Sequence, residues 1–309
     1  MFRYDQLKKS PHSFQTLTGI SITEFDELFV RFDPLWQQNE RQRLNQRKRQ
    51  RQIGAGRKYE LDLKSQVVMI LVWLHLYLST ETLGLLFGVS KSSISRNTRR
   101  GVVVLRQFGR NSVWWQEPPG KYDGKSLKEA LAEYPDLLSV IDVMEITIQR
   151  PQGGEQQTEH YSGKKKAHTR KVGVMVNECG LIRGLTDSRP GNTHDLTVFR
   201  QSGLLGRIPE ETSVIGDKAF RGMQVDLPNH SVGTPFKPGK NTPLDDAEHW
   251  ANRDLSRQRI IVENTICELR HFKILADRFR HALSWCTEVV YAIVALINPR
   301  ISRRLAVAH

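Results

Sequence analysis

The stretch LLSVIDVMEITIQR, residues 137–150, is the most informative segment for the architecture of the larger part of this chain. It is rich in β-branched residues and therefore predicts a strand. One acid, Asp142, lies inside the apolar run, between Ile141 and Val143. A carboxylate in such a place is costly unless it is paired or coordinates a metal ion. The stretch thus predicts a buried strand and, at Asp142, a candidate site.

The segments that follow predict a mixed α/β domain. KVGVMVNECG (171–180) and LIRGLTDSR (181–189) indicate two strands joined by a hairpin at residues 178–180. HDLTVFRQSGLL (194–205) indicates a helix after Thr193, and SVIGDKAF (213–220) a short buried strand that ends in a charge. Helices are expected over roughly 245–280, with breaks, and over 284–297. Three strands, a helix, a strand and further helices are typical of this fold class.

Upstream, residues 61–108 predict a helix-turn-helix. LDLKSQVVMILVWLHLYL (61–78) is a strongly apolar helix, ETLGLLFG (81–88) a short second helix, and KSSISRNTRRGVVVLRQF (91–108) a third helix whose first half is polar and basic. In this geometry the start of the third helix faces the major groove. An ordinary three-helix packing unit would have similar spacing, but the acid-free polar face favours DNA. The residues expected there are Lys91, Ser92, Ser93, Ser95, Arg96 and Arg99.

The charge of the chain also favours a polyanionic partner. The 309 residues include 46 Lys and Arg against 33 Asp and Glu, a formal net charge of +13. The surplus gathers in acid-free runs at 41–58 and 91–110 and in a third block at 164–171, which predicts phosphate binding. Candidate phosphate contacts in the first and third blocks are Arg47, Lys48, Arg49, Lys164, Lys165 and Lys166.

Composition also bears on domains and compartment. We expect a helical segment over 1–58 that ends in a Gln- and Arg-rich arm or linker at 37–58, a helix-turn-helix domain over 59–112, a linker over 113–136 and a catalytic α/β domain over 137–309. Three cysteines are too few for a disulfide framework, which indicates a reducing compartment. The longest apolar run, 67–78, is too short to span a bilayer. A cytoplasmic, nucleoid-associated protein without membrane contact is expected, or a nuclear one in a eukaryote.

Two further carboxylates lie at the edges of apolar elements. Asp217 ends the strand at 213–216, and Glu263 lies on a predicted helix with Arg259 and Arg270 near its face. Each acid alone would be interpreted as a structural ion pair. Three such acids together favour a metal site, because hard divalent cations prefer oxygen ligands. Glu145 ranks below them, because strand alternation places it on the face opposite Asp142.

Five ordered blocks resemble the DDE transposases of bacterial insertion sequences, in the branch related to Harbinger elements. The blocks are IDVMEITIQRP (141–151), YSGKKKAHTRK (161–171), PGNTHDLTVFRQSGL (190–204), VIGDKAFRG (214–222) and RDLSRQRIIVENTICELRHFKIL (253–275). The sequence departs from the usual pattern at Met144, at Ala219-Phe220 and at Arg270, but it retains all three acids.

The resemblance implies a ribonuclease-H-like domain, a mixed sheet flanked by helices, that follows the all-α helix-turn-helix domain. It implies that Asp142, Asp217 and Glu263 hold two Mg²⁺ ions, with Mn²⁺ as a substitute, and cleave and rejoin DNA strands. Arg259 and Arg270 would grip phosphate. The implied partners are double-stranded DNA, as element ends and as target, and further copies of the chain on that DNA.

Alternatives remain at this stage. The chain is either a DNA transposase or a catalytically silent DNA-binding protein, a decayed or domesticated copy; a nuclease that cuts without joining would share the site. His194 and Asp195 match the family motif but begin a predicted helix, where an aspartate is stabilised by the helix dipole. We expect a structural role, with support of the site as the alternative. Cys267, His271, His281 and Cys286 match no common zinc pattern.

Overall fold

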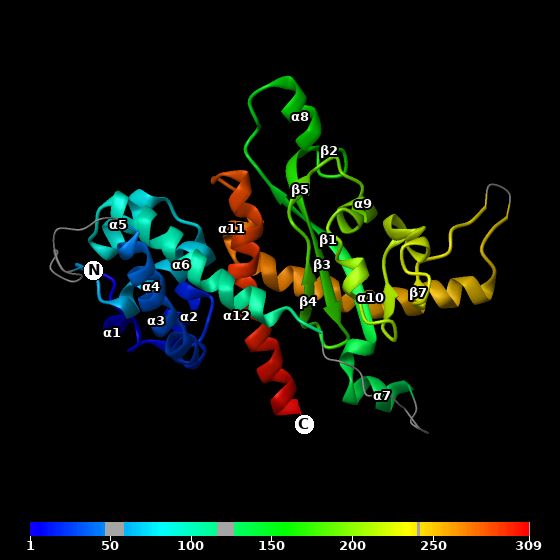
Figure 1. Cartoon of the computed structure of the whole chain (residues 1–309), viewed down its shortest axis with the longest axis horizontal. Helices are drawn as coiled ribbons and strands as arrows, with labels where there is room; N and C mark the ends of the chain where they lie inside the picture. Colours follow the sequence, from blue (N-terminus) through cyan, green and yellow to red (C-terminus); the bar gives the residue numbers. More distant parts are fainter. Residues whose placement is uncertain (47–58, 116–126, 240–241, 309) are drawn as a thin grey trace. The chain divides into compact units, whose positions relative to one another are not determined.

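The computed structural model of the chain describes residues 1–46, 59–115, 127–239 and 242–308. The chain divides into two compact units (Figure 1). The first unit comprises residues 1–110, 270–277 and 288–300, and the second unit comprises 111–269, 278–287 and 301–309. The units therefore differ from the division expected from sequence, since two segments near the C-terminus belong to the first unit.

The first unit is entirely helical in its described part. Its helices are α1 (Tyr4–Leu7), α2 (Pro11–Thr18), α3 (Ile22–Asn45), α4 (Leu63–Leu76), α5 (Thr80–Phe87), α6 (Lys91–Ser112), α11 (Lys273–Ala276) and the middle of α12 (Cys286–Ala308). Helix α4 is buried over Ser65–His75 and packs against α2, α3, α5 and α11. A helix that is apolar on all sides has to lie at the centre of a bundle. The predicted helix-turn-helix is thus built around α4.

The turn between α5 and α6 follows from its end residues. Ser79 caps α5 by accepting a hydrogen bond from the Thr82 amide at 3.1 Å, and Gly88 ends the helix in the left-handed conformation, with φ of 69°. Glycine adopts this conformation at little cost. Helix α6 then begins at Lys91, as expected from the sequence.

Two segments expected to be linkers are partly helical. Helix α3 begins at a capping box formed by Ser21 and Glu24 and continues past Pro34 to Asn45, so the expected arm at 37–58 is helical in its first part. Gln, Arg and Glu are good helix formers, which explains why a polar composition did not end the helix. Within the expected linker 113–136, helix α7 spans Leu127–Glu133. The rest of the arm, from residue 47, lies outside the described residues.

The second unit contains a mixed sheet. Its strands are β1 (Leu138–Thr147), β2 (Tyr161–Ser162), β3 (Ala167–Asn177), β4 (Ile182–Leu185), β5 (Arg189–Pro190), β6 (Ser213–Ile215) and β7 (Val232–Gly233). The order is β2-β3-β1-β6-β7, with β4 and β5 also on β3. β1 pairs antiparallel with β3 and parallel with β6. The expected hairpin joins β3 to β4, and its Gly180 has φ of 80°.

Helices accompany this sheet. They are α8 (Gly154–His160), α9 (Asp195–Arg200) and α10 (Asp246–His271), and α12 continues to Ala308, beyond the end expected at 297. Ile141 and Met175 on the sheet pack against Leu196 and Phe199 of α9 in a buried cluster. Helix α10 crosses behind the strands in Figure 1, and the Thr265 hydroxyl lies 3.1 Å from the carbonyl oxygen of Gly180. The mixed α/β prediction is confirmed.

Among the described residues, no helix combines the length and the apolar character that a membrane span requires.

Candidate active site and DNA-binding surface

The register of two parallel strands brings Asp142 and Asp217 together. Val140 of β1 lies opposite Ile215 of β6. Each acid follows two residues later in its own strand direction, and neighbouring strands lie about 5 Å apart. Asp217 comes just after the end of β6, where its Oδ1 accepts a hydrogen bond from the Ala219 amide at 2.8 Å.

The Asp142 carboxyl is largely removed from water. Burial raises its pKa to about 6 from the ordinary 3.8, and the charge of Asp217 adds to the increase. The Val143 amide, which donates to Asp142 Oδ1 at 2.7 Å, and the cations Arg259 and Lys164 act in the opposite direction. A buried acid beside a second acid is an arrangement that a cation would stabilise.

Glu263 occupies a different environment. It lies on α10 with its side chain 55% exposed, and Arg259, one turn earlier, lies 3.3 Å from its Oε1. The charge of the Arg259 guanidinium also offsets part of the rise in the pKa of Asp142. Its Nε is buried without a hydrogen-bond partner among the described residues. Arg259 is thus paired with Glu263 and also acts electrostatically on Asp142.

Two of the three predicted acids offer oxygen ligands that suit a divalent metal ion. Within the described residues, no three His, Cys, Asp or Glu side chains are close enough to hold a metal ion. Asp142 and Asp217 fit, because they offer neighbouring carboxylate oxygens whose mutual repulsion a hard cation would relieve. Glu263 is not gathered with them.

The other basic residues predicted near the site are distributed over two places. Lys164, Lys165 and Lys166 are exposed on the tight turn between β2 and β3, and Lys166 has φ of 53°. Lys164 is close enough for its charge to act on Asp142. Arg270 falls in the first unit, at the last turn of α10.

His194 and Asp195 lie at the start of α9. His194 is an exposed N-cap residue that makes no side-chain capping bond, and Asp195 is the first helical residue. Lys171 Nζ lies 2.8 Å from Asp195 Oδ1 and donates to the Thr193 carbonyl at 2.7 Å. Sequence reasoning missed this ion pair, although a lysine at the start of the apolar run KVGVMV was a signal for it. The pair ties α9 to β3.

Glu145, which sequence reasoning ranked below the three acids, is tied to the neighbouring strand. The Thr169 hydroxyl donates to its Oε2 at 2.9 Å.

The predicted DNA-contacting residues of the helix-turn-helix lie on the first three turns of α6. Lys91, Ser92, Arg96 and Arg99 are exposed, while Ser93 and Ser95 are partly buried. Lys91 is paired with Glu81 at 2.5 Å, and Ser93 shares a hydrogen bond with Ser90 at 3.0 Å. Arg47, Lys48 and Arg49 lie outside the described residues.

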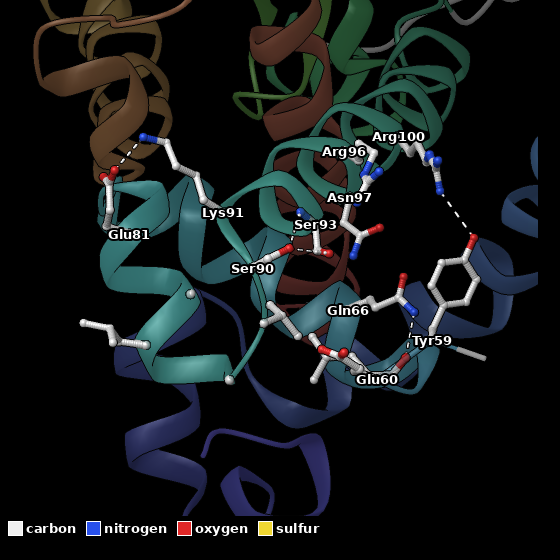
Figure 2. Close-up of a pocket in the computed structure, with 15 residues that line it drawn as sticks. Tyr59, Glu60, Gln66, Glu81, Ser90, Lys91, Ser93, Arg96, Asn97 and Arg100 are labelled. Carbon is white, nitrogen blue, oxygen red and sulfur yellow. Dashed lines mark hydrogen bonds and ion pairs between the residues drawn. The ribbon is translucent and has the colours of Figure 1, made fainter. Parts of the chain in front are cut away.

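Beside this face lies a hollow of about 950 Å³, which sequence reasoning did not identify (Figure 2). It is bounded by the start of α4, by α5, by the α5–α6 turn and by a stripe of α6. Of its lining residues, Lys91, Ser93 and Arg96 were predicted, whereas Tyr59, Gln66, Asn97 and Arg100 are among those that were not. The spacing of residues 93, 97 and 100, which places them on one side of a helix, was the available signal.

Comparisons with known proteins found matches to the helix-turn-helix and to the α/β part of the chain. A family model described as the helix-turn-helix of the DDE superfamily endonuclease matches residues 59–110. A probable transposase for insertion sequence element IS702 from Microchaete diplosiphon is 29% identical over 227 residues, which are 73% of this chain and 76% of that protein. No solved structure matches the chain. The family model described as DDE superfamily endonuclease matches residues 141–298, just over half of the chain. The chain therefore belongs to the DDE superfamily of endonucleases and carries the helix-turn-helix domain of that superfamily.

Proposed function

We propose that this endonuclease is a DNA transposase that recognises the ends of its element through the helix-turn-helix and cleaves and joins DNA strands. The similarity to the probable transposase of IS702, which extends over most of both chains, supports joining as well as cutting. The observation that carries the proposal is the pair of acids, Asp142 and Asp217, side by side at neighbouring parallel strands.

Endonuclease domains of this superfamily use divalent metal ions. We propose that Asp142 and Asp217, with Glu263, hold Mg²⁺, with Mn²⁺ as a substitute. Two such ions, when bound, would neutralise charge on the attacking and leaving oxygens of a phosphodiester. Glu263 can join them only if it exchanges its contact with Arg259 for the metal.

In this proposal the basic residues around the acids also contact the phosphates of the bound DNA. A DNA strand at Asp142 brings phosphates to Lys164 and Arg259, whose charges already act on that carboxyl. Phosphodiester cleavage depends on positioning and charge neutralisation more than on covalent help from the protein. Lys164 and Arg259 would therefore orient the scissile strand, while Lys165, Lys166 and Arg270 would hold more distant backbone. Because His194 is exposed and Asp195 is paired with Lys171, we assign both a structural role.

Recognition of the element end would belong to the first three turns of α6, through Lys91, Ser92, Ser93, Ser95, Arg96 and Arg99. The arm residues Arg47, Lys48 and Arg49 would add contacts to phosphate that do not depend on sequence. We further propose that copies of the chain assemble on paired ends, and that the protein acts where the host DNA lies, in the cytoplasm of a bacterium or in a nucleus.

The test uses purified protein, DNA bearing candidate element ends, and Mg²⁺. Wild type should cut at the ends and transfer the freed 3′ strand to a target plasmid, and Asp217→Asn and Glu263→Gln should each lose at least a hundredfold of both products, a loss typical for removal of one essential group. Asp187→Asn, an exposed acid of the same unit, is the matched control.

The exposed position of Glu263 and its contact with Arg259 favour one competing candidate, a DNA-binding protein without chemistry. Equal background breakage by wild type and by both variants would establish that candidate. Cleavage without any transfer would identify a nuclease.

A further inference from the structure

The hollow beside α6 contains a buried hydrogen-bond acceptor without a partner. Gln66, on the first turn of α4, is 3% exposed. Its Nε2 donates to the Leu61 carbonyl at 2.8 Å, which fixes the orientation of the amide because only the nitrogen can donate. The Oε1 atom is buried and accepts no hydrogen bond from the described residues. Buried acceptors are almost always satisfied, so this one indicates a missing donor.

A second amide lies across the hollow from it. Asn97 of α6 is 7% exposed, and Figure 2 shows Gln66 and Asn97 pointing toward one another from the two helices. An Asn or Gln amide both donates and accepts, and it pairs well with the edge of a nucleobase that does the same.

Positive charge lines the hollow on the α6 side. Lys91 is neutralised by Glu81, whereas the Arg96 guanidinium lies 3.5 Å from the hydroxyl of Ser92, an uncharged partner. Arg100 lies 3.5 Å from Glu40, whose carboxylate is held more closely by Arg43 at 2.7 Å. Glu60 also lines the hollow, so the lining carries three cations and two acids. The surplus favours a ligand with one negative charge.

We propose that this hollow binds one nucleotide, with an amino group of its base at Gln66 Oε1, its base edge also at Asn97, and its phosphate at Arg96 and Arg100. A nucleotide unites the N–H donor, the paired hydrogen-bonding edge and the anion in one molecule. The inference rests on the proposed function, since a DNA strand bound at α6 would bring such a nucleotide to the hollow. A free nucleotide offers the same chemistry and is the other source to be distinguished.

The test changes the Gln66 amide in the protein and one base amino group in the DNA, singly and in combination. Gln66→Leu keeps the approximate size of the side chain and removes the Oε1 acceptor, together with the Nε2 donor to the Leu61 carbonyl. Fluorescence anisotropy should show about tenfold weaker binding of element-end DNA, the size expected when one buried polar contact is lost. Changing single adenines to purine, which lacks the 6-amino group, should weaken binding by wild type at one position and leave binding by Gln66→Leu unchanged there.

Gln107→Leu, an amide on α6 outside the hollow, is the matched control and should bind every duplex as wild type does. If Gln66→Leu does not fold, binding of the same duplexes is measured with Asn97→Ser, which should show the same loss of affinity and the same coupling to a purine substitution. Melting curves of the variants, recorded first, establish which of them are folded.

Thermal shifts with dAMP, dCMP and inorganic phosphate separate the sources. A rise in the melting temperature of wild type with dAMP or dCMP that is absent in Gln66→Leu supports a site for free nucleotides. If the Gln66 and purine changes are coupled in duplex binding but neither mononucleotide raises the melting temperature, the site binds a nucleotide of the bound DNA. The inference is overturned if folded Gln66→Leu binds all duplexes like wild type, or if phosphate alone reproduces the shift in both proteins. Wild type that neither prefers element ends nor cuts them would instead refute the proposed function.

Discussion

Replacing Asp142 by Asn should stabilise the metal-free protein. In the folded state the pKa of this carboxyl is raised from 3.8 to about 6, chiefly by burial and then by the charge of Asp217. A carboxyl whose pKa is raised on folding costs stability wherever it is ionised. The cost is therefore complete above about pH 6, shrinks as the pH falls through the folded pKa, and is absent below the unfolded value.

The magnitude follows from the size of the shift. About two pKa units at about 1.4 kcal/mol each give a cost of roughly 3 kcal/mol at pH 8. For a unit of this size each kcal/mol moves the melting temperature by about 2–4 °C, so Asp142→Asn should melt roughly 6–12 °C higher than wild type at pH 8 in EDTA. At pH 5, which is still above the unfolded pKa, the difference should fall to about half of its value at pH 8.

The assay is thermal melting followed by circular dichroism, with Asp187→Asn, an exposed acid of the second unit, as the control that should not respond. Adding Mg²⁺ or Mn²⁺ should raise the melting temperature of wild type and leave that of Asp142→Asn unchanged, because a ligand stabilises only the state that binds it. If the variant melts at or below wild type at pH 8, and the gap does not depend on pH, the assignment of a desolvated charge to Asp142 is refuted.

Two further predictions concern the first unit. Gly109→Ala should destabilise this unit by about 1–3 kcal/mol, because an added Cβ would lie 1.8 Å from the Tyr291 carbonyl oxygen of α12. The measurement is denaturant titration, and the control is Gly206→Ala, where an added Cβ has no heavy atom within 4 Å. Equal unfolding midpoints for the two variants would contradict the close approach of Gly109 to Tyr291. Burial lowers the pKa of His75, with His271, Arg300 and Lys273 adding to the effect, so the first unit should lose stability as the pH falls below about 6.5, where the unfolded chain takes up the proton. His75→Phe should flatten this dependence in melting curves between pH 8 and pH 5, and an unchanged slope would show that His75 does not cause it.

Much of each unit could be predicted from local patterns. The helix boundaries around 61–108, the hairpin at Gly180 and the strand that carries Asp142 all follow from residues within a few positions of one another. The segments that were misjudged, 37–45 and 127–133, are polar stretches whose helicity depends on weak propensities. Position in the sequence also could not reveal that residues 270–277 and 288–300 pack with the N-terminal helices, because packing between distant segments leaves no periodic signal in either one.

For the site, local sequence patterns identified the reactive groups: an acid inside an apolar strand, an acid at the end of a second strand, and basic runs suited to phosphate. Which of these groups lie close together depends on how the elements pack. The parallel register of β1 and β6 brings Asp142 beside Asp217, whereas Glu263 contacts Arg259 instead. Gln66 and Asn97 line one hollow that neither helix forms alone. The physical reason is that periodicity fixes which face of an element a side chain occupies, while the energy of a charge or an amide depends on what a different element places next to it.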